Sequence, residues 1–231
     1  TLPFADPSQV RLFLQDVDEA GGSTESTSVL TFSADKGRLK TRICSDWAEG
    51  RGFTTRLIER RFGSDMRVAN DEPLLALCGV DNPQARAILE GAGFATIFEA
   101  GLGSGAADFR LVRTHSFPAL VSAKEVWADH ATGKPGSEIE TRPAYVDLKS
   151  RGGLDECGLT RLAEVAVGAP FVGMAAAAVL VAQVIRLIVD GQRPTVLNMD
   201  LRTLQHRSLV DREGADIVIF RTAACRGNGS R

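Results

Sequence analysis

The chain has 231 residues, a length that suits one domain with a sizeable core. It carries 27 Lys and Arg against 29 Asp and Glu, and this net charge of −2, without a long basic run, argues against nucleic-acid binding. Its four cysteines form no C-x-x-C pair and no signal peptide is visible, so we expect no zinc and a cytoplasmic location. Because the chain begins at Thr1 rather than Met, we also expect a segment upstream of it.

The first half of the chain alternates apolar strands with helices. Apolar side chains recur every four residues over 35–53 before a glycine, a pattern typical of a helix. Asn82 is a suitable N-cap for a second helix over 82–93, with proline at its first position. Strands are predicted over 10–18, 54–62, 73–81 and 94–103. This alternation predicts an α/β fold with a mostly parallel, Rossmann-like sheet and helices on both faces.

The second half is less regular. A strand is predicted over 108–118, and the polar, Gly- and Pro-containing residues 129–153 predict a long flexible crossover loop, of a length that is often functional. A long apolar helix follows. C-terminal strands are predicted over 195–204 and 215–220, and 221–231 form a tail. We expect residues 1–231 to form a single domain.

The long apolar stretch of residues 165–191 is open to two interpretations. Its length would allow a membrane span. However, Pro170 and Gly173 interrupt its start, its middle is alanine-rich, and Gln183 and Arg186 fall in its last third. A helix packed closely within the protein therefore fits better, and we expect no membrane association.

Acidic residues follow two of the predicted strands. Asp16 and Asp18 end the strand of 10–18, and Asp81 ends the strand of 73–81. Ligands of open α/β sheets bind outside the carboxyl ends of the strands, where an acid can accept hydrogen bonds from a ribose or hold Mg²⁺ against a triphosphate. Lys40 could meet a phosphate as a point charge. Alternatively, these side chains are merely solvated.

The order of motifs resembles the ThiF/MoeB/HesA family, bacterial relatives of ubiquitin-activating enzymes. The resemblance covers about residues 10–204 and includes a cysteine, a Gly-Pro turn and a long helix within 157–188. The other motifs are "DVD" (16–18), "STESTS" (23–28), "DKGRLK" (35–40), "CGVDNPQAR" (78–86), "AGF" (92–94) and "AGLG" (100–103).

The resemblance implies ATP-dependent adenylylation of the C-terminal carboxylate of a ubiquitin-like or sulfur-carrier protein, by a homodimer. Asp16 matches the acid that binds ribose, and Lys40 matches the lysine that contacts phosphate. Asp81 matches the acid that positions Mg²⁺, and the adjacent Asn82 is assigned to the nucleotide site. Cys157 matches a cysteine that takes the activated acyl group or carries sulfur, although it could equally be a buried cysteine near a helix start.

Three departures from the family pattern leave an alternative open. No Gly-rich phosphate loop precedes residues 10–18, so we expect that loop in an upstream segment. Thr24 and Thr27 stand where the family has Asn and Arg, and the zinc-binding C-x-x-C pairs are missing. The alternative is a catalytically degenerate scaffold. A dinucleotide oxidoreductase is not supported, because no G-x-G-x-x-G follows the first strand.

Overall fold

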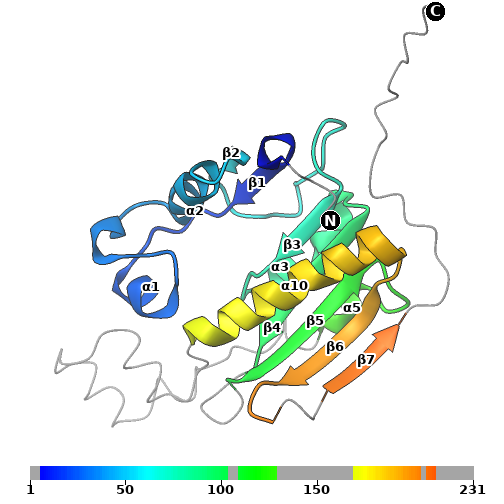
Figure 1. Ribbon diagram of the computed structural model, residues 1–231. Helices are drawn as coiled ribbons and strands as arrows, with labels where there is room; N and C mark the ends of the chain where they lie inside the picture. The colour runs from blue at the N-terminus through cyan, green and yellow to red at the C-terminus, as the bar shows by residue number, and fades with distance from the viewer. Residues whose placement is uncertain (1–5, 104–108, 129–168, 204–206, 212–231) are drawn as a thin grey trace, which may run out of the picture.

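The computed structural model describes residues 6–103, 109–128, 169–203 and 207–211 (Figure 1). The predicted loop 129–153, Cys157, the predicted strand 215–220 and the tail 221–231 lie outside the described residues. The described strands form two sheets, one of two strands and one of five. The first segment is a short 3₁₀ turn, Pro7–Gln9.

The smaller sheet pairs β1 (Arg11–Gln15) with β2 (Thr54–Ile58) in parallel. The chain between them forms α1 (Gly22–Thr27), a 3₁₀ turn (Ser33–Asp35) and α2 (Lys40–Glu49). Helix α2 buries Ile43 and Ala48, and the Ser45 and Thr55 hydroxyls lie 2.6 Å apart between helix and sheet. The helix predicted over 35–53 is thus confirmed but starts later, and its Trp47 is 43% exposed.

The larger sheet has the strand order β3-β4-β5-β6-β7. Only β3 and β4 pair in parallel, and the other three pairs are antiparallel. Its strands are β3 (Leu75–Cys78), β4 (Thr96–Leu102), β5 (Leu111–Phe117), β6 (Pro194–Asp200) and β7 (Arg207–Asp211).

The α/β, Rossmann-like class is confirmed, but its sheet is mixed rather than mostly parallel. Only residues 103–110 separate β4 from β5, fewer than the dozen or more that a parallel crossover needs. The connection between β6 and β7, residues 201–206, is also too short for a parallel crossover. The short connections therefore account for the antiparallel β4–β5 and β6–β7 pairs, whereas β5 and β6, which also pair antiparallel, are separated by residues 118–193.

Helices cover both faces of the larger sheet, as predicted, because successive β4 side chains point to opposite faces. Ile97 packs with Leu89 and Ala123 on the face of α3 (Pro83–Ala87), the 3₁₀ turn Leu89–Ala92 and α5 (Ala123–Val126). Phe98 packs with Leu180 and Leu187 of α10 (Pro170–Asp190), which runs across the other face (Figure 1). The helix predicted over 82–93 is therefore an α-helix followed by a 3₁₀ turn.

By length and composition alone, helix α10 could cross a membrane, and the described residues contain one helix of this kind. It nevertheless packs against the sheet. Its buried side chains, spaced three or four apart, are Val172, Ala176, Leu180, Gln183 and Leu187. Gln183 donates to the Thr114 hydroxyl of β5 over 2.7 Å, and Gly191, with φ of 67°, ends the helix. This packing seats one side of α10 on the sheet, while the opposite side exposes Phe171, Met174, Val181 and Val189.

Candidate functional site

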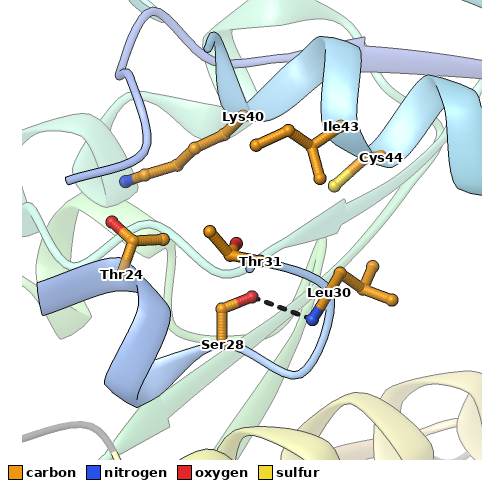
Figure 2. Close-up of a pocket in the computed structure, with 7 residues that line it drawn as sticks. All are labelled: Thr24, Ser28, Leu30, Thr31, Lys40, Ile43 and Cys44. Atoms are coloured by element: carbon orange, nitrogen blue, oxygen red, sulfur yellow. Dashed lines mark hydrogen bonds between the residues drawn. The ribbon is translucent and has the colours of Figure 1, made fainter. Parts of the chain in front are cut away.

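A pocket of about 250 Å³ opens between α1, the segment that follows it and the start of α2 (Figure 2). Lys40 and Thr24 lie at one end, and Leu30 and Cys44 at the other. The remaining lining residues are Ser28, Thr31 and Ile43. The pocket thus combines one cation and several hydroxyl groups with an apolar wall, a mixture that suits a small polar ligand with an apolar part.

The hydroxyl groups of the pocket also shape the backbone around it. The Thr24 hydroxyl accepts a hydrogen bond from the Gly21 amide over 3.0 Å at the start of α1. Beyond the helix, the Ser28 hydroxyl accepts one from the Leu30 amide over 3.2 Å. These local bonds hold the turn after α1 in place. The wall opposite α2 is therefore preformed.

Lys40 joins the end of β1 to the start of α2. Its amide donates to the Asp18 carbonyl over 2.9 Å, and its Nζ lies 3.4 Å from Asp18 Oδ2. The Lys40 side chain is 35% exposed and that of Asp18 is 53% exposed, so water screens their attraction. Because the ion pair is long and wet, Lys40 can exchange Asp18 for an anionic ligand at low cost.

Asp16 is not among the residues that line this pocket, but its charge acts on Cys44, which does line it. Its Oδ1 accepts hydrogen bonds from the amides of Val17 and Asp18, over 2.7 and 3.0 Å, which fixes the turn after β1. Burial raises the pKa of the Cys44 thiol, and the negative charge of Asp16 raises it further. Lys40 thus lines the pocket, whereas Asp16 is linked to it through the effect of its charge on Cys44.

Asp81 and Asn82 lie in the turn between β3 and α3, and neither lines this pocket. Asp81 is exposed. The Asn82 side chain accepts hydrogen bonds from the amides of Gln84 and Ala85, over 2.8 and 3.1 Å, so its predicted N-cap role is confirmed. In the part of the chain that the structure describes, no group of three or more His, Cys, Asp or Glu side chains is arranged to hold a metal.

The sequence analysis missed a buried polar cluster on the α3 and α5 face. Glu99 of β4 is fully buried, and its Oε1 lies 2.7 Å from His115 Nδ1 and accepts a 2.9 Å hydrogen bond from Trp127 Nε1. The guanidinium carbon of Arg86 lies 4.7 Å from the centre of the same Trp127 ring. A glutamate within the mostly apolar residues 94–102 was the available signal, because a buried charge requires partners.

Comparison with known proteins identifies the family. The model of the family described as "BilD C-terminal domain" matches residues 1–191. The chain belongs to the BilD C-terminal domain family. It is 42% identical over 204 residues to the bacterial E1-like protein BilD of Collimonas sp. (strain OK412), an alignment that covers 88% of this chain and 44% of that relative. This BilD-family chain therefore spans less than half of the curated relative's length.

Solved structures resemble the BilD-family chain in fold. Escherichia coli MccB, crystallised with AMPCPP and MccA, gives a TM-score of 0.54 at 15% identity, covering 88% of this chain and 57% of MccB. PaaA gives a TM-score of 0.51 at 14% identity, covering 87% of this chain and 64% of PaaA. At these identities the likeness shows a shared fold alone.

Proposed function

We propose that this domain is the nucleotide-binding part of an E1-like adenylyltransferase. In the reaction, a carboxylate oxygen attacks the α-phosphorus of ATP, the bond to the β-phosphate oxygen breaks, and acyl adenylate and pyrophosphate form. The observation that carries the proposal is the pocket beyond the carboxyl end of β1, which Lys40 lines beside its partner Asp18 and where the charge of Asp16 acts on the lining residue Cys44. That end of a parallel strand is where nucleotides bind in this class of fold.

The proposal gives each predicted residue a role. The Asp16 carboxylate accepts hydrogen bonds from ribose hydroxyls, and Lys40 leaves Asp18 to contact a phosphate. Asn82 caps α3 and its side chain lies beside the phosphates. Asp81 is an exposed carboxylate at the carboxyl end of β3, and Mg²⁺ commonly takes one or two protein carboxylates together with substrate phosphates, so this residue fits a shared Mg²⁺. When bound, Mg²⁺ supplies neutralisation of phosphate charge.

We propose a peptide or small carrier protein as the acceptor, activated at its C-terminal carboxylate. MccB structures contain the peptide MccA, and the curated relative is described as E1-like, which supports a polypeptide acceptor. The finer assignment, a ubiquitin-like or sulfur-carrier protein, follows from the motif resemblance. Cys157, outside the described residues, is proposed to take the acyl group as a thioester. A trapped thioester that persists in a Cys157→Ala variant would exclude that residue.

An upstream strand with a Gly-rich turn is proposed to complete the phosphate site. Strand β1 pairs only with β2, and β3 only with β4, among the strands that the structure describes. No β1 residue is fully buried, although Leu12, Phe13 and Leu14 are apolar, and Leu77 of β3 is 51% exposed. A strand between these two edges would cover both and place its turn between Asp16 and Asp81.

We also propose a cytoplasmic homodimer. The exposed apolar side of α10, formed by Phe171, Met174, Val181 and Val189, supports association because such a surface is costly to hydrate. A second copy is the proposed occupant, since symmetric homodimers are the commonest oligomers. Light scattering of the full-length protein tests this proposal: a Met174→Glu variant is expected to dissociate, and a monomeric wild type contradicts it.

A degenerate scaffold is the second candidate. The observation in its favour is that Thr24, which stands where the family has Asn, already accepts a hydrogen bond from the Gly21 amide with its hydroxyl. Calorimetric titration of ATP with Mg²⁺ into full-length protein separates the two candidates. Binding together with ATP–pyrophosphate exchange in the presence of the acceptor supports the enzyme. Absence of both supports the scaffold.

A further inference from the structure

Arg86 is a buried arginine that sequence analysis did not single out as a functional residue. It lies on α3 and is 5% exposed. Its Nε donates to the Val80 carbonyl over 2.5 Å, and its Nη2 donates to the Ala100 carbonyl over 2.9 Å. One guanidinium thus bridges the turn after β3 to the carboxyl-terminal part of β4.

The surroundings of Arg86 hold its guanidinium in that bridging position. Trp127 lies beneath it, with the ring centre 4.7 Å from the guanidinium carbon, and Glu99 accepts from the indole nitrogen of the same ring. On another side is Gly101, where an added Cβ would lie 2.8 Å from Arg86 Nη1. The lack of a side chain at Gly101 therefore gives the guanidinium room.

The two ends of the β3–α3 turn are both anchored. Val80 is held through its carbonyl by Arg86, and Asn82 is held by its own cap bonds to Gln84 and Ala85. Asp81 lies between them and is exposed. With a fixed residue on each side, the backbone of Asp81 is held, and so is the direction in which its side chain leaves the turn.

We infer that Arg86 is a positioning residue: it holds Asp81 where that carboxylate meets Mg²⁺ and the triphosphate. This inference rests on the proposed function for the role of Asp81, while the anchoring itself rests on the contacts of Arg86. Residues that orient a metal ligand without touching the metal typically change metal affinity by about 10- to 100-fold when they are replaced. Arg86 acts through the Val80 backbone and is not itself a ligand.

Three variants separate positioning from general damage. Arg86→Met keeps the apolar stem and removes both bridging donors. Gly101→Ala leaves the charge in place and displaces the guanidinium, which also covers the case that Arg86→Met fails to fold. The matched control is Arg51→Met, because Arg51 likewise stacks on a tryptophan, 3.8 Å from the Trp47 ring centre, but lies at the far end of α2.

The first measurement is amide hydrogen exchange of full-length protein without nucleotide. Residues 79–85 are expected to exchange at least about tenfold faster in Arg86→Met and in Gly101→Ala than in wild type or Arg51→Met. Unchanged exchange in both variants would overturn the positioning role, whatever the nucleotide experiments give.

The second measurement is ATP affinity by calorimetry, with Mg²⁺ and with EDTA. The Arg86→Met and Gly101→Ala variants are expected to bind ATP about tenfold more weakly with Mg²⁺ and unchanged in EDTA. Equal weakening in both conditions would overturn the inference, because it would mark a general loss of the nucleotide site. If wild type binds no ATP, the proposed function fails, and so does the link from Arg86 to Mg²⁺, while the exchange data still decide the anchoring.

Discussion

The negative charge of Asp16 acts on the Cys44 thiol, which lines the pocket at the start of α2. Burial is the larger cause of the raised Cys44 pKa, whose ordinary value is 9.0, and Asp16 adds to it. Asp16 is the residue proposed to bind ribose, and the Cys44 thiol that its charge affects can be labelled chemically. Cys44 is therefore a reporter of the pocket.

The first prediction concerns alkylation of Cys44 by iodoacetamide, which attacks the thiolate. Because its pKa is raised, Cys44 should react more slowly than a solvent-exposed thiol at pH 8, and the rate should keep rising above pH 9. Asp16→Asn removes the negative charge, lowers the pKa and speeds the reaction. Mass spectrometry of the labelled peptide measures both effects, and a slower Asp16→Asn reaction would contradict them.

The same thiol gives a pH dependence of stability. A group whose pKa is higher in the folded state contributes stability below its unfolded pKa and loses it as pH rises through the folded pKa. Unfolding free energy should therefore fall above about pH 9 in wild type, and fall less in Cys44→Ala. Urea unfolding at pH 8 and pH 10 makes the comparison. Equal losses in the two proteins would show that Cys44 is not the cause.

Lys40 is expected to contribute to ATP affinity rather than to folding. Lys40→Met should weaken ATP binding about tenfold, the effect of losing one charged hydrogen bond. It should change unfolding free energy by less than about 1 kcal/mol, because the Asp18 pair is exposed. Lys36→Met, an exposed lysine before the same helix, is the control. If Lys40→Met and Lys36→Met bind ATP with equal affinity, Lys40 is not part of the nucleotide site.

Asp81→Asn is expected to reduce ATP–pyrophosphate exchange about a hundredfold, since Mg²⁺ stabilisation is worth several kcal/mol. The fold should be unaffected, because Asp81 is exposed. Asp65→Asn, another exposed acid that pairs with Arg60, is the control and should keep wild-type exchange. If the Asp81→Asn variant also keeps the wild-type rate of ATP–pyrophosphate exchange, Asp81 takes no part in the reaction.

The packing of α10 gives a stability prediction that is independent of function. Leu187 is 2% exposed in a cluster with Phe98 and Leu180, so Leu187→Ala should cost about 2–4 kcal/mol. Val189→Ala, two residues along the same helix and 68% exposed, should cost less than about 0.5 kcal/mol in the isolated domain. Denaturant unfolding measures both. Similar values for the two would mean that α10 is not seated on the sheet as described.

Local sequence patterns predicted the elements well, because their causes are local. The apolar run of 73–81 gave β3, and Asn82 followed by proline gave the start of α3. The antiparallel direction of β5 follows from the short 103–110 connection. That Lys40 lies near the acids after β1 was predictable, because they flank one connection between a strand and a helix.

The buried cluster was harder to predict, because its members come from distant elements. Arg86 stands in a helix where arginine is normally solvated, and its partners at positions 100 and 127 depend on how α3 and α5 lie on β4. Glu99 was the stronger signal, as a carboxylate between apolar neighbours. Even so, the sequence does not say that His115 and Trp127 would share it.

Gly101 and Arg86 have a consequence for how such domains diverge. The guanidinium occupies the volume that a methyl group at position 101 would claim, so the two positions act as one unit. A lineage that replaces the arginine loses the need for glycine, whereas a side chain gained at 101 displaces the guanidinium from its place. The effect of a change at either position therefore depends on the residue at the other.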